Sequence, residues 1–402
     1  MSNSKQEIAR ELSHFPMPRR PCYPKQETIM NTQERNRNPY QNIDWGKQIR
    51  VTGCTHVHCS TRNEFIQAME SGLEFATFAN YYPSAPYYPA SSIRENTFKL
   101  GQPSYVRNGE VVHERLDIRK LFAEWGEDQS QLPTSEGELL FPHAPAGFLE
   151  APNAEHHFFS DYNVYLHITC PGSFFASGNY NRNRRSVLAQ HGIHVGTQMP
   201  WRKAFDAMLE ALMIPDGGGI VINHPHWSHL PHQFLCELLD YDPRVLGLEV
   251  INSNCGKEGT AAAESQWDEV LGTGRQCYGF CVQDHINCNE KLQGRSILLP
   301  EERTAESCLR AYRQGRFYGA LKGEGLKFES IEFDGRTLRV RCDKEAIILL
   351  LSHRGVLVEL WTGRELLYTV PDSDRSKDVF LRVTALDQKS GEKLFTQPFM
   401  LV

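Results

Sequence analysis

The sequence of 402 residues has no excess of basic residues and no long apolar segment. Its 43 Lys and Arg residues are outnumbered by 49 Asp and Glu residues, whereas a general binder of nucleic acid or membrane surfaces carries a basic excess or patch. The most apolar run, residues 346–351, is far shorter than the roughly 20 residues that a membrane span needs. We therefore expect neither nucleic acid nor a membrane as a partner.

Residues 1–20 lack the apolar core of a secretory signal. The 11 cysteines are an odd number scattered over a long chain, unlike the dense framework of a small disulfide-linked domain. They include no Cys-x-x-Cys pair, which argues against a zinc site built on thiolates. These absences predict a cytoplasmic protein with reduced cysteines.

The composition divides the chain into three segments, in keeping with the two or three domains expected for its length. Residues 1–46 are rich in Asn, Gln, Pro and Arg and predict an N-terminal extension. Residues 47–325 alternate between strand and helix patterns, interrupted by a Pro-rich insertion at about residues 82–151. Residues 326–402 are a series of strand-like runs and turn signals, typical of a small β-sandwich-like module.

The middle segment has the pattern of an α/β protein. Residues 200–214 place apolar side chains at helical spacing, and a short apolar strand follows at residues 220–222. A helix pattern at residues 234–239 is followed in the same way by a strand pattern at residues 246–251. Such alternation indicates a parallel sheet or a barrel.

Histidine is abundant, with 16 residues, several of them at the ends of expected strands. His56 and His58 form a His-x-His pair whose rings face the same way on a strand, so both can bind one ion. His224 and Asp284 each follow a strand, at the end that forms the active face of β/α barrels. Glu249, near another strand end, is expected to orient a histidine and not to bind an ion.

Each of these residues also has a purely structural interpretation. A His-x-His pair alone is a weak signal, and we give its structural interpretation even weight. His167 lies within an apolar strand pattern, where a hydrogen-bonded core histidine is equally consistent, and Glu155 alone would most often be an exposed loop charge. The common position at strand ends is what favours a metal site.

The chain resembles the PHP superfamily (polymerase and histidinol phosphatase) of metal-dependent phosphoesterases over roughly residues 47–325. The matching segments are residues 55–58 (Thr-His-Val-His), 72–75 (Gly-Leu-Glu-Phe), 222–225 (Ile-Asn-His-Pro), 248–252 (Leu-Glu-Val-Ile-Asn), 282–285 (Val-Gln-Asp-His) and 314–319 (Gln-Gly-Arg-Phe-Tyr-Gly), together with Glu155 and His167. The resemblance implies an α/β fold, a distorted (β/α)7 TIM-like barrel, here with a small C-terminal all-β module.

By position, the resemblance also implies a centre of two divalent metal ions. The first ion would use His56, His58, Glu155 and Asp284, and the second would share Glu155 and add His167 and His224. A shared carboxylate would offset the repulsion between two cations. Mixed imidazole and carboxylate ligation suits zinc, manganese or iron.

Three departures from the family pattern fall on the ligands of a third ion. Asn80 and Tyr81 stand where the family usually has Asp-His, and residues 60–63 replace an acidic Ser-Asp-Gly segment. Asp284 and His285 are adjacent, whereas the family usually has Asp-x-His. We expect a two-metal centre in which the third metal site is lost and its position is empty or filled by Asn80, Tyr81 or a substrate group, and Asn80 and Tyr81 are also candidate substrate contacts.

Two further groups of residues are weaker candidates. Arg182, Arg184 and Arg185 follow the segment of His167 and could clamp a phosphate, although a solvated basic turn is the commoner role of such a cluster. His285 and His226 are candidates for the proton donor, with no sequence signal that chooses between them.

The expected function is that of a metal-dependent phosphoesterase acting on a small phosphorylated molecule. A hydroxide held by two metal ions would attack phosphorus in line with the leaving alkoxide. The first alternative is a metal-dependent hydrolase of an amide, lactone or carboxylic ester. The second is an inactive PHP-like binding module with the C-terminal β module as its interaction surface. The sequence identifies neither the substrate nor the oligomeric state.

Overall fold

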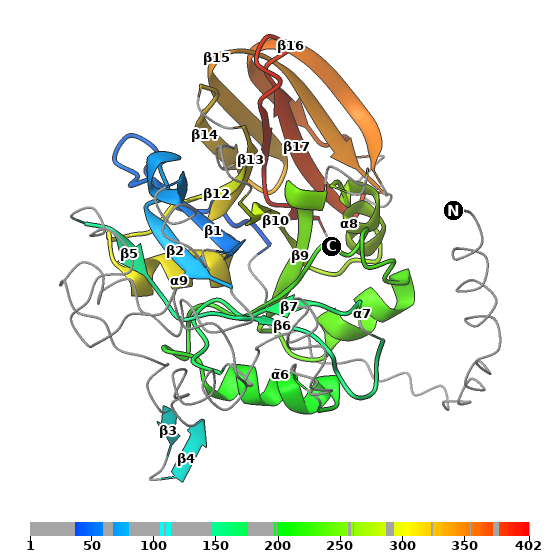
Figure 1. Cartoon of the computed structure of the whole chain (residues 1–402). Helices are drawn as coiled ribbons and strands as arrows, with labels where there is room; N and C mark the ends of the chain where they lie inside the picture. The colour runs from blue at the N-terminus through cyan, green and yellow to red at the C-terminus, as the bar shows by residue number, and fades with distance from the viewer. Residues whose placement is uncertain are drawn as a thin grey trace, which may run out of the picture. The chain divides into compact units, whose positions relative to one another are not determined.

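The computed structural model describes residues 37–58, 67–79, 105–107, 110–113, 147–163, 165–175, 197, 199–255, 259, 261–286, 293–322, 325–353, 355–372 and 378–401. Within them, strands are far more extensive than helices (Figure 1). No helix in this part of the chain combines the length and the apolarity needed to cross a bilayer.

Twelve strands form one large mixed sheet. β1 (Val51–His58) is parallel to β2 (Phe75–Phe78), which is parallel to the short β5 (Leu149–Glu150). On its other side, β1 is antiparallel to β12 (Gly294–Leu298), and β12 is antiparallel to β13 (Phe317–Leu321). β1 therefore lies inside the sheet, and nearly all of its residues are buried.

The C-terminal strands continue this sheet through antiparallel pairs. β13 pairs with β18, which pairs with β17, and β17 also pairs with β15 and β19. β15 also pairs with β14 and with β16. β15 and β16 together form the long hairpin visible in Figure 1. The bounds of these strands are β14 Phe328–Phe333, β15 Thr337–Ser352, β16 Val356–Thr369, β17 Phe380–Leu386, β18 Lys393–Phe395 and β19 Phe399–Met400.

A second sheet has five strands in the order β10-β9-β8-β7-β6. β8, β9 and β10 are parallel, whereas β7 is antiparallel to both of its neighbours. The bounds are β6 Glu155–His156, β7 Ile168–Thr169, β8 Ile220–Ile222, β9 Val245–Asn252 and β10 Tyr278–Val282. The strand expected at residues 220–222 is confirmed as β8, and the one expected at residues 246–251 lies within β9.

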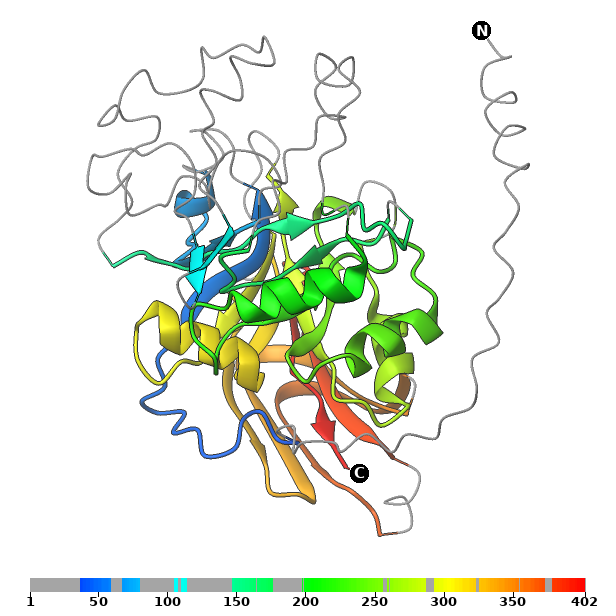
Figure 2. The ribbon, with the colours of Figure 1, turned by 90° about the horizontal axis from the view of Figure 1, so that it is seen from below.

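Helices precede the three parallel strands of this second sheet. They are α6 (Trp201–Glu210), α7 (His232–Asp240) and α8 (Glu264–Leu271), and each buries an apolar stripe. Figure 2 shows them beside the five-stranded sheet. Ile220 and Ile222 of β8 pack into the same apolar cluster as these helices.

Val221, between those two isoleucines, points to the opposite face and packs into another cluster. That cluster contains residues of β1, β2 and α9 (Ala305–Gln314). Because alternate residues of a strand face opposite sides, the five-stranded sheet is covered on both faces. Its second face looks toward β1, so polar side chains at the ends of both sets of strands can meet between the two sheets.

The expected distorted (β/α)7 TIM-like barrel is wrong. The described strands fall into separate sheets, no closed barrel is present among them, and β7 runs against its neighbours. A parallel connection needs a crossover of about a dozen residues, usually a helix, but the described residues between β6 and β7 contain no helix. The C-terminal strands are also not a separate sheet, because β18 pairs with β13.

The predicted insertion contains one described antiparallel pair, β3 (Tyr105–Arg107) and β4 (Glu110–His113). Most of the predicted N-terminal extension lies outside the described residues, which begin at residue 37.

Candidate metal centre

His56 and His58 occupy the carboxyl end of β1 and are almost completely buried. Val57, between them, packs in the apolar core with β2. The alternation of the strand therefore turns one residue into the core and both imidazoles to the other side. Their Nε2 atoms are 3.1 Å apart, so the two rings converge on one point.

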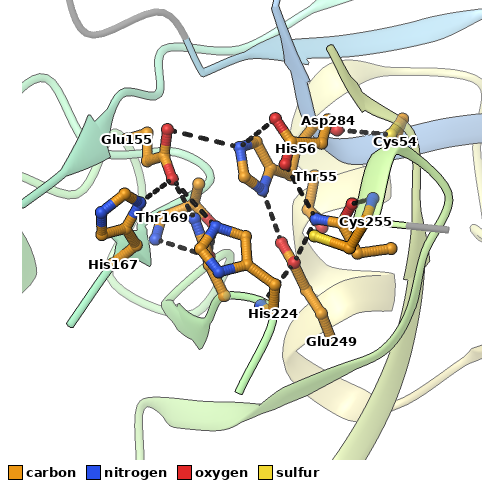
Figure 3. A network of polar contacts seen from close by, with 12 residues as sticks. Cys54, Thr55, His56, Glu155, His167, Thr169, His224, Glu249, Cys255 and Asp284 are labelled. Atoms are coloured by element: carbon orange, nitrogen blue, oxygen red, sulfur yellow. Dashed lines mark hydrogen bonds and ion pairs between the residues drawn. The ribbon is translucent and has the colours of Figure 1, made fainter. Parts of the chain in front are cut away.

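Glu155, at the start of β6, has histidines on both sides, and Figure 3 shows it between His56 and His167 with His224 nearby. Its Oε2 is 3.6 Å from His56 Nε2 and 3.2 Å from His58 Nε2. Its Oε1 is 2.8 Å from His167 Nδ1 and 3.3 Å from His224 Nε2. One carboxylate thus offers a different oxygen to each pair, which is the arrangement of a bridging ligand.

Asp284 reaches the same region from β11 (Asp284–His285), which pairs with the end of β1. Its Oδ1 is 3.5 Å from His56 Nε2 and 3.3 Å from His58 Nε2. Its Oδ2 accepts a hydrogen bond of 3.0 Å from the side-chain amide of Asn252. One oxygen faces the histidines while the other is fixed by a neighbour, so the carboxylate is held in a single orientation.

Two of these residues have a backbone conformation that L-residues rarely adopt. The φ angle is 64° at Asp284 and 25° at His224. Such conformations cost about 1–3 kcal/mol each and persist where the surrounding structure demands them. Each residue is separated by one residue from the end of a parallel strand, His224 from β8 and Asp284 from β10. The turn at each strand end directs the side chain back toward Glu155 and β1.

The ligand atoms form two compact groups, in each of which all atoms lie within 4.8 Å of one another. One group is His56, Glu155 and His224, and the other is His56, His58 and Asp284. Ligands about 2.1 Å from a tetrahedral ion lie about 3.4 Å from one another, close to the 3.1–3.6 Å that separates His56 Nε2 from its neighbours. The donor set fits divalent metal ions, and these buried groups could bind them.

Glu249, on β9, holds two of the ligands in place. Its Oε1 is 2.7 Å from His56 Nδ1, and its Oε2 accepts a hydrogen bond of 2.7 Å from the backbone N–H of His224. A carboxylate on Nδ1 favours the tautomer with its proton there, which leaves Nε2 free as a ligand. Asn252 links Glu249 to Asp284 by donating to both carboxylates, at 3.0 Å each.

The buried carboxylates dominate the electrostatics. Burial alone would lower the pKa of His56, but the negative charges of Asp284, Glu249 and Glu155 outweigh it and raise this pKa well above 6.5. Burial alone would raise the pKa of Glu155, but the positive charges of His56 and His167 lower it well below its usual range. The centre therefore attracts positive charge, either as protons or as metal ions.

Protons and metal ions compete for Nε2 of His56, which gives a prediction for pH. Because the pKa of His56 is raised in the folded state, its protonation stabilises the metal-free protein, and this stabilisation is fully present at pH values below the ordinary pKa of 6.5. The stabilisation is lost as pH rises through the raised pKa of the folded state. Over that range the ring becomes available to an ion. We expect Zn²⁺ to raise Tm more at about pH 8 than at about pH 6. Thermal unfolding followed by circular dichroism measures this, and an equal or smaller increase at the higher pH would contradict it.

The other candidate site residues named in the sequence analysis lie at the edge of the ligand groups, away from them, or outside the described residues. His167 contacts Glu155 but belongs to neither compact group of ligand atoms. His285 stacks on His58 with ring centroids 4.1 Å apart, and its side chain is 29% exposed. His226 is exposed, with Nδ1 2.7 Å from the carbonyl oxygen of Ala262. The other candidates lie outside the described residues: Asn80, Tyr81, Arg182, Arg184 and Arg185.

Two asparagines of the network had no assigned role in the sequence analysis. Asn252 links two carboxylates, and Asn223 donates to Glu155 Oε1 at 3.3 Å while its own oxygen accepts from Thr169. Both lie within the segments that carry the family resemblance. Asn223 directly precedes His224, and Asn252 is three residues after Glu249. Their position at strand ends was the available signal, but the contacts of Asn252 with Asp284 and of Asn223 with Glu155 join segments that are distant in sequence.

Comparison with known proteins gives little beyond this geometry. No protein-family model and no curated protein matches the sequence. The chain is similar to a crystal structure from Bacteroides vulgatus, described as a two-domain protein containing a predicted PHP-like metal-dependent phosphoesterase. The similarity covers 88% of this chain and 94% of the other, with a TM-score of 0.36 and 12% identity. A similarity this weak carries no argument, so any functional assignment depends on the centre itself.

Proposed function

We propose that the protein is a metal-dependent hydrolase of phosphate esters. The observation that carries this proposal is the bridging position of Glu155, one oxygen of which faces His56 and His58 while the other faces His167 and His224. Two bound divalent ions would supply Lewis-acid stabilisation of the phosphoryl oxygens and lower the pKa of an attacking water. A phosphate ester suits a paired centre because its several anionic oxygens can share two cations.

The protein's own residues prepare this chemistry. Glu155 and Asp284 provide negative charge that offsets the charge of the ions, and Glu249 fixes the ring of His56. Burial of these groups excludes bulk water, which strengthens their electrostatic interactions. His285 lies against His58 and is partly open to solvent. We assign to it the donation of a proton to the leaving alkoxide, a role for which the tethered and exposed His226 is less suited.

The test combines metal analysis with a substrate panel. The full chain is stripped of metal, reconstituted separately with zinc, manganese or iron, and assayed on phosphomonoesters, phosphodiesters, carboxylic esters, lactones and amides. We expect about two ions per chain and hydrolysis of phosphate esters only, with both reduced in Asp284→Asn. Fewer than one ion per chain after reconstitution would defeat the proposal, and hydrolysis confined to carboxyl substrates would replace it with the alternative hydrolase.

Glu249→Gln tests the orientation of His56. The amide keeps the size of the side chain and an oxygen near His56 Nδ1, but it removes a buried negative charge. Loss of such a supporting partner typically weakens metal binding or activity about 10- to 100-fold. We expect a decrease in this range by titration calorimetry with Zn²⁺, and no change for Glu237→Gln on the exposed side of α7. Equal affinities in the two variants would show that Glu249 does not support the centre.

A further inference from the structure

Two aromatic side chains extend from the centre toward solvent on the side of His167 and His224. The ring of Trp227 meets the ring of His224 edge-on, with centroids 4.9 Å apart, and that of His167 with centroids 5.6 Å apart. Tyr165 contacts the outer side of this group, with its ring centroid 5.7 Å from that of Trp227. The three contacts form a continuous aromatic path from two residues of the centre to the surface.

The backbone fixes both aromatic residues relative to the residues of the centre. Tyr165 is two residues before His167, and its N–H donates a hydrogen bond of 2.9 Å to the side chain of Asn163. Trp227 lies in the turn that follows His224, which is closed by a hydrogen bond of 3.0 Å from the N–H of Ser228 to the carbonyl of His224. A group bound against these rings would therefore have a defined position relative to the metal centre.

The exposure of Tyr165 is unusual for this molecule. Six large hydrophobic side chains are exposed among the described residues, and five of them lie on β16. Tyr165 is the sixth, with 46% of its surface exposed. Ligand sites are commonly lined by aromatic side chains with a few polar groups that fix orientation. Tyr165 and Trp227, next to the buried polar residues of the centre, provide this combination of aromatic and polar groups.

We propose that Tyr165 and Trp227 bind a planar aromatic group in the alcohol part of the substrate, either an aryl group or the base of a nucleoside. The inference rests on the proposed function, because the phosphoryl group would bind next to the metal ions that His56, Glu155 and His224 could hold. Stacking on an aromatic ring is tolerant of the exact planar group. An aryl group and a nucleoside base both meet the requirement, which is a planar aromatic group attached close to the phosphate of the substrate.

The test compares phenyl phosphate, adenosine monophosphate and glycerol phosphate on the metal-loaded protein. Binding is measured by equilibrium dialysis and turnover by phosphate release. We expect both aromatic phosphates to bind about 10-fold more tightly than glycerol phosphate. We expect Tyr165→Ala and Trp227→Leu to raise KM for these two substrates about 10-fold while leaving metal content and the kinetics of glycerol phosphate unchanged. Preference for one aromatic phosphate over the other identifies the aryl or the nucleoside source.

Trp361→Ala, at an exposed aromatic residue of β16, is the matched control and should change none of these values. Equal binding of all three phosphates would overturn the inference. Equal losses on all three substrates in Trp227→Leu, with reduced metal content, would also overturn it, because the ring would then only support His167 and His224. If the wild-type protein hydrolyses no phosphate ester, the proposed function fails, and the dialysis experiment still decides whether the aromatic site exists.

Discussion

Replacement of His56 by alanine is expected to abolish binding of the ion near His58 and Asp284, because the Nε2 of His56 can bind one ion, and to reduce turnover about 10³-fold or more. His56 is the one residue common to both groups of ligand atoms, and its side chain is completely buried. Metal ions contribute several kcal/mol to the stabilisation of a transition state, and each 1.36 kcal/mol corresponds to about tenfold in rate. Loss of about 4 kcal/mol therefore gives about 10³-fold. Metal content by mass spectrometry and initial rates on the best phosphate ester measure the two effects.

His58→Ala provides a graded comparison, because His58 belongs to only one of the two groups. We expect this variant to retain more metal than His56→Ala. His232→Ala, at an exposed histidine of α7, should behave as wild type and controls for the loss of a histidine in general. Circular dichroism establishes that each variant is folded. A folded His56→Ala protein that keeps two ions and full turnover would exclude a catalytic centre at this place.

Part of the centre could be predicted because it depends on short-range periodicity. Alternate residues of a strand share a face, so the spacing of His56 and His58 was sufficient to orient them together. The position of His224 one residue beyond the end of β8 follows from an equally local pattern, a short apolar run that is followed by Asn-His-Pro. The same rules could not show that Glu155 places a different oxygen against each pair of histidines, because that depends on packing between two sheets.

The predicted barrel was wrong because the direction and the pairing partners of the strands cannot be read from the sequence pattern. An apolar run such as that of β7 has the same pattern whether its neighbours are parallel or antiparallel, and here both are antiparallel. The strand-like runs after residue 326 likewise gave no sign that β18 pairs with β13 and so joins the sheet of β1. Residues 337–352 form one long strand, β15, with a register shift against β16 between Arg341 and Ala346. Pairing partners are non-local, and a single sequence does not encode them in its periodicity.

The second large effect is expected on stability, from the buried ion pair between Arg382 of β17 and Asp268 of α8. Arg382 Nε and Nη2 each donate to a different oxygen of Asp268 at 2.6 Å, and both side chains are almost completely buried. The guanidinium also lies 4.8 Å from the ring centre of Trp267 and donates to Thr384. Removing one partner leaves the other charge buried without compensation, which costs about 3–5 kcal/mol. We expect Asp268→Ala to lower the free energy of unfolding by this amount.

The exposed pair between Arg275 and Asp240 is a matched control, because Arg275 also donates to both oxygens of its partner, at 2.8 and 2.7 Å. Asp240→Ala should cost no more than about 1 kcal/mol, since solvent screens the pair and rehydrates the remaining charge. Urea unfolding monitored by fluorescence gives both values. The two pairs have nearly the same hydrogen-bond geometry and differ in burial, so a large difference in cost measures desolvation of Arg382. Equal costs would mean instead that solvent reaches Arg382 when its partner is removed, and that the link between β17 and α8 opens easily.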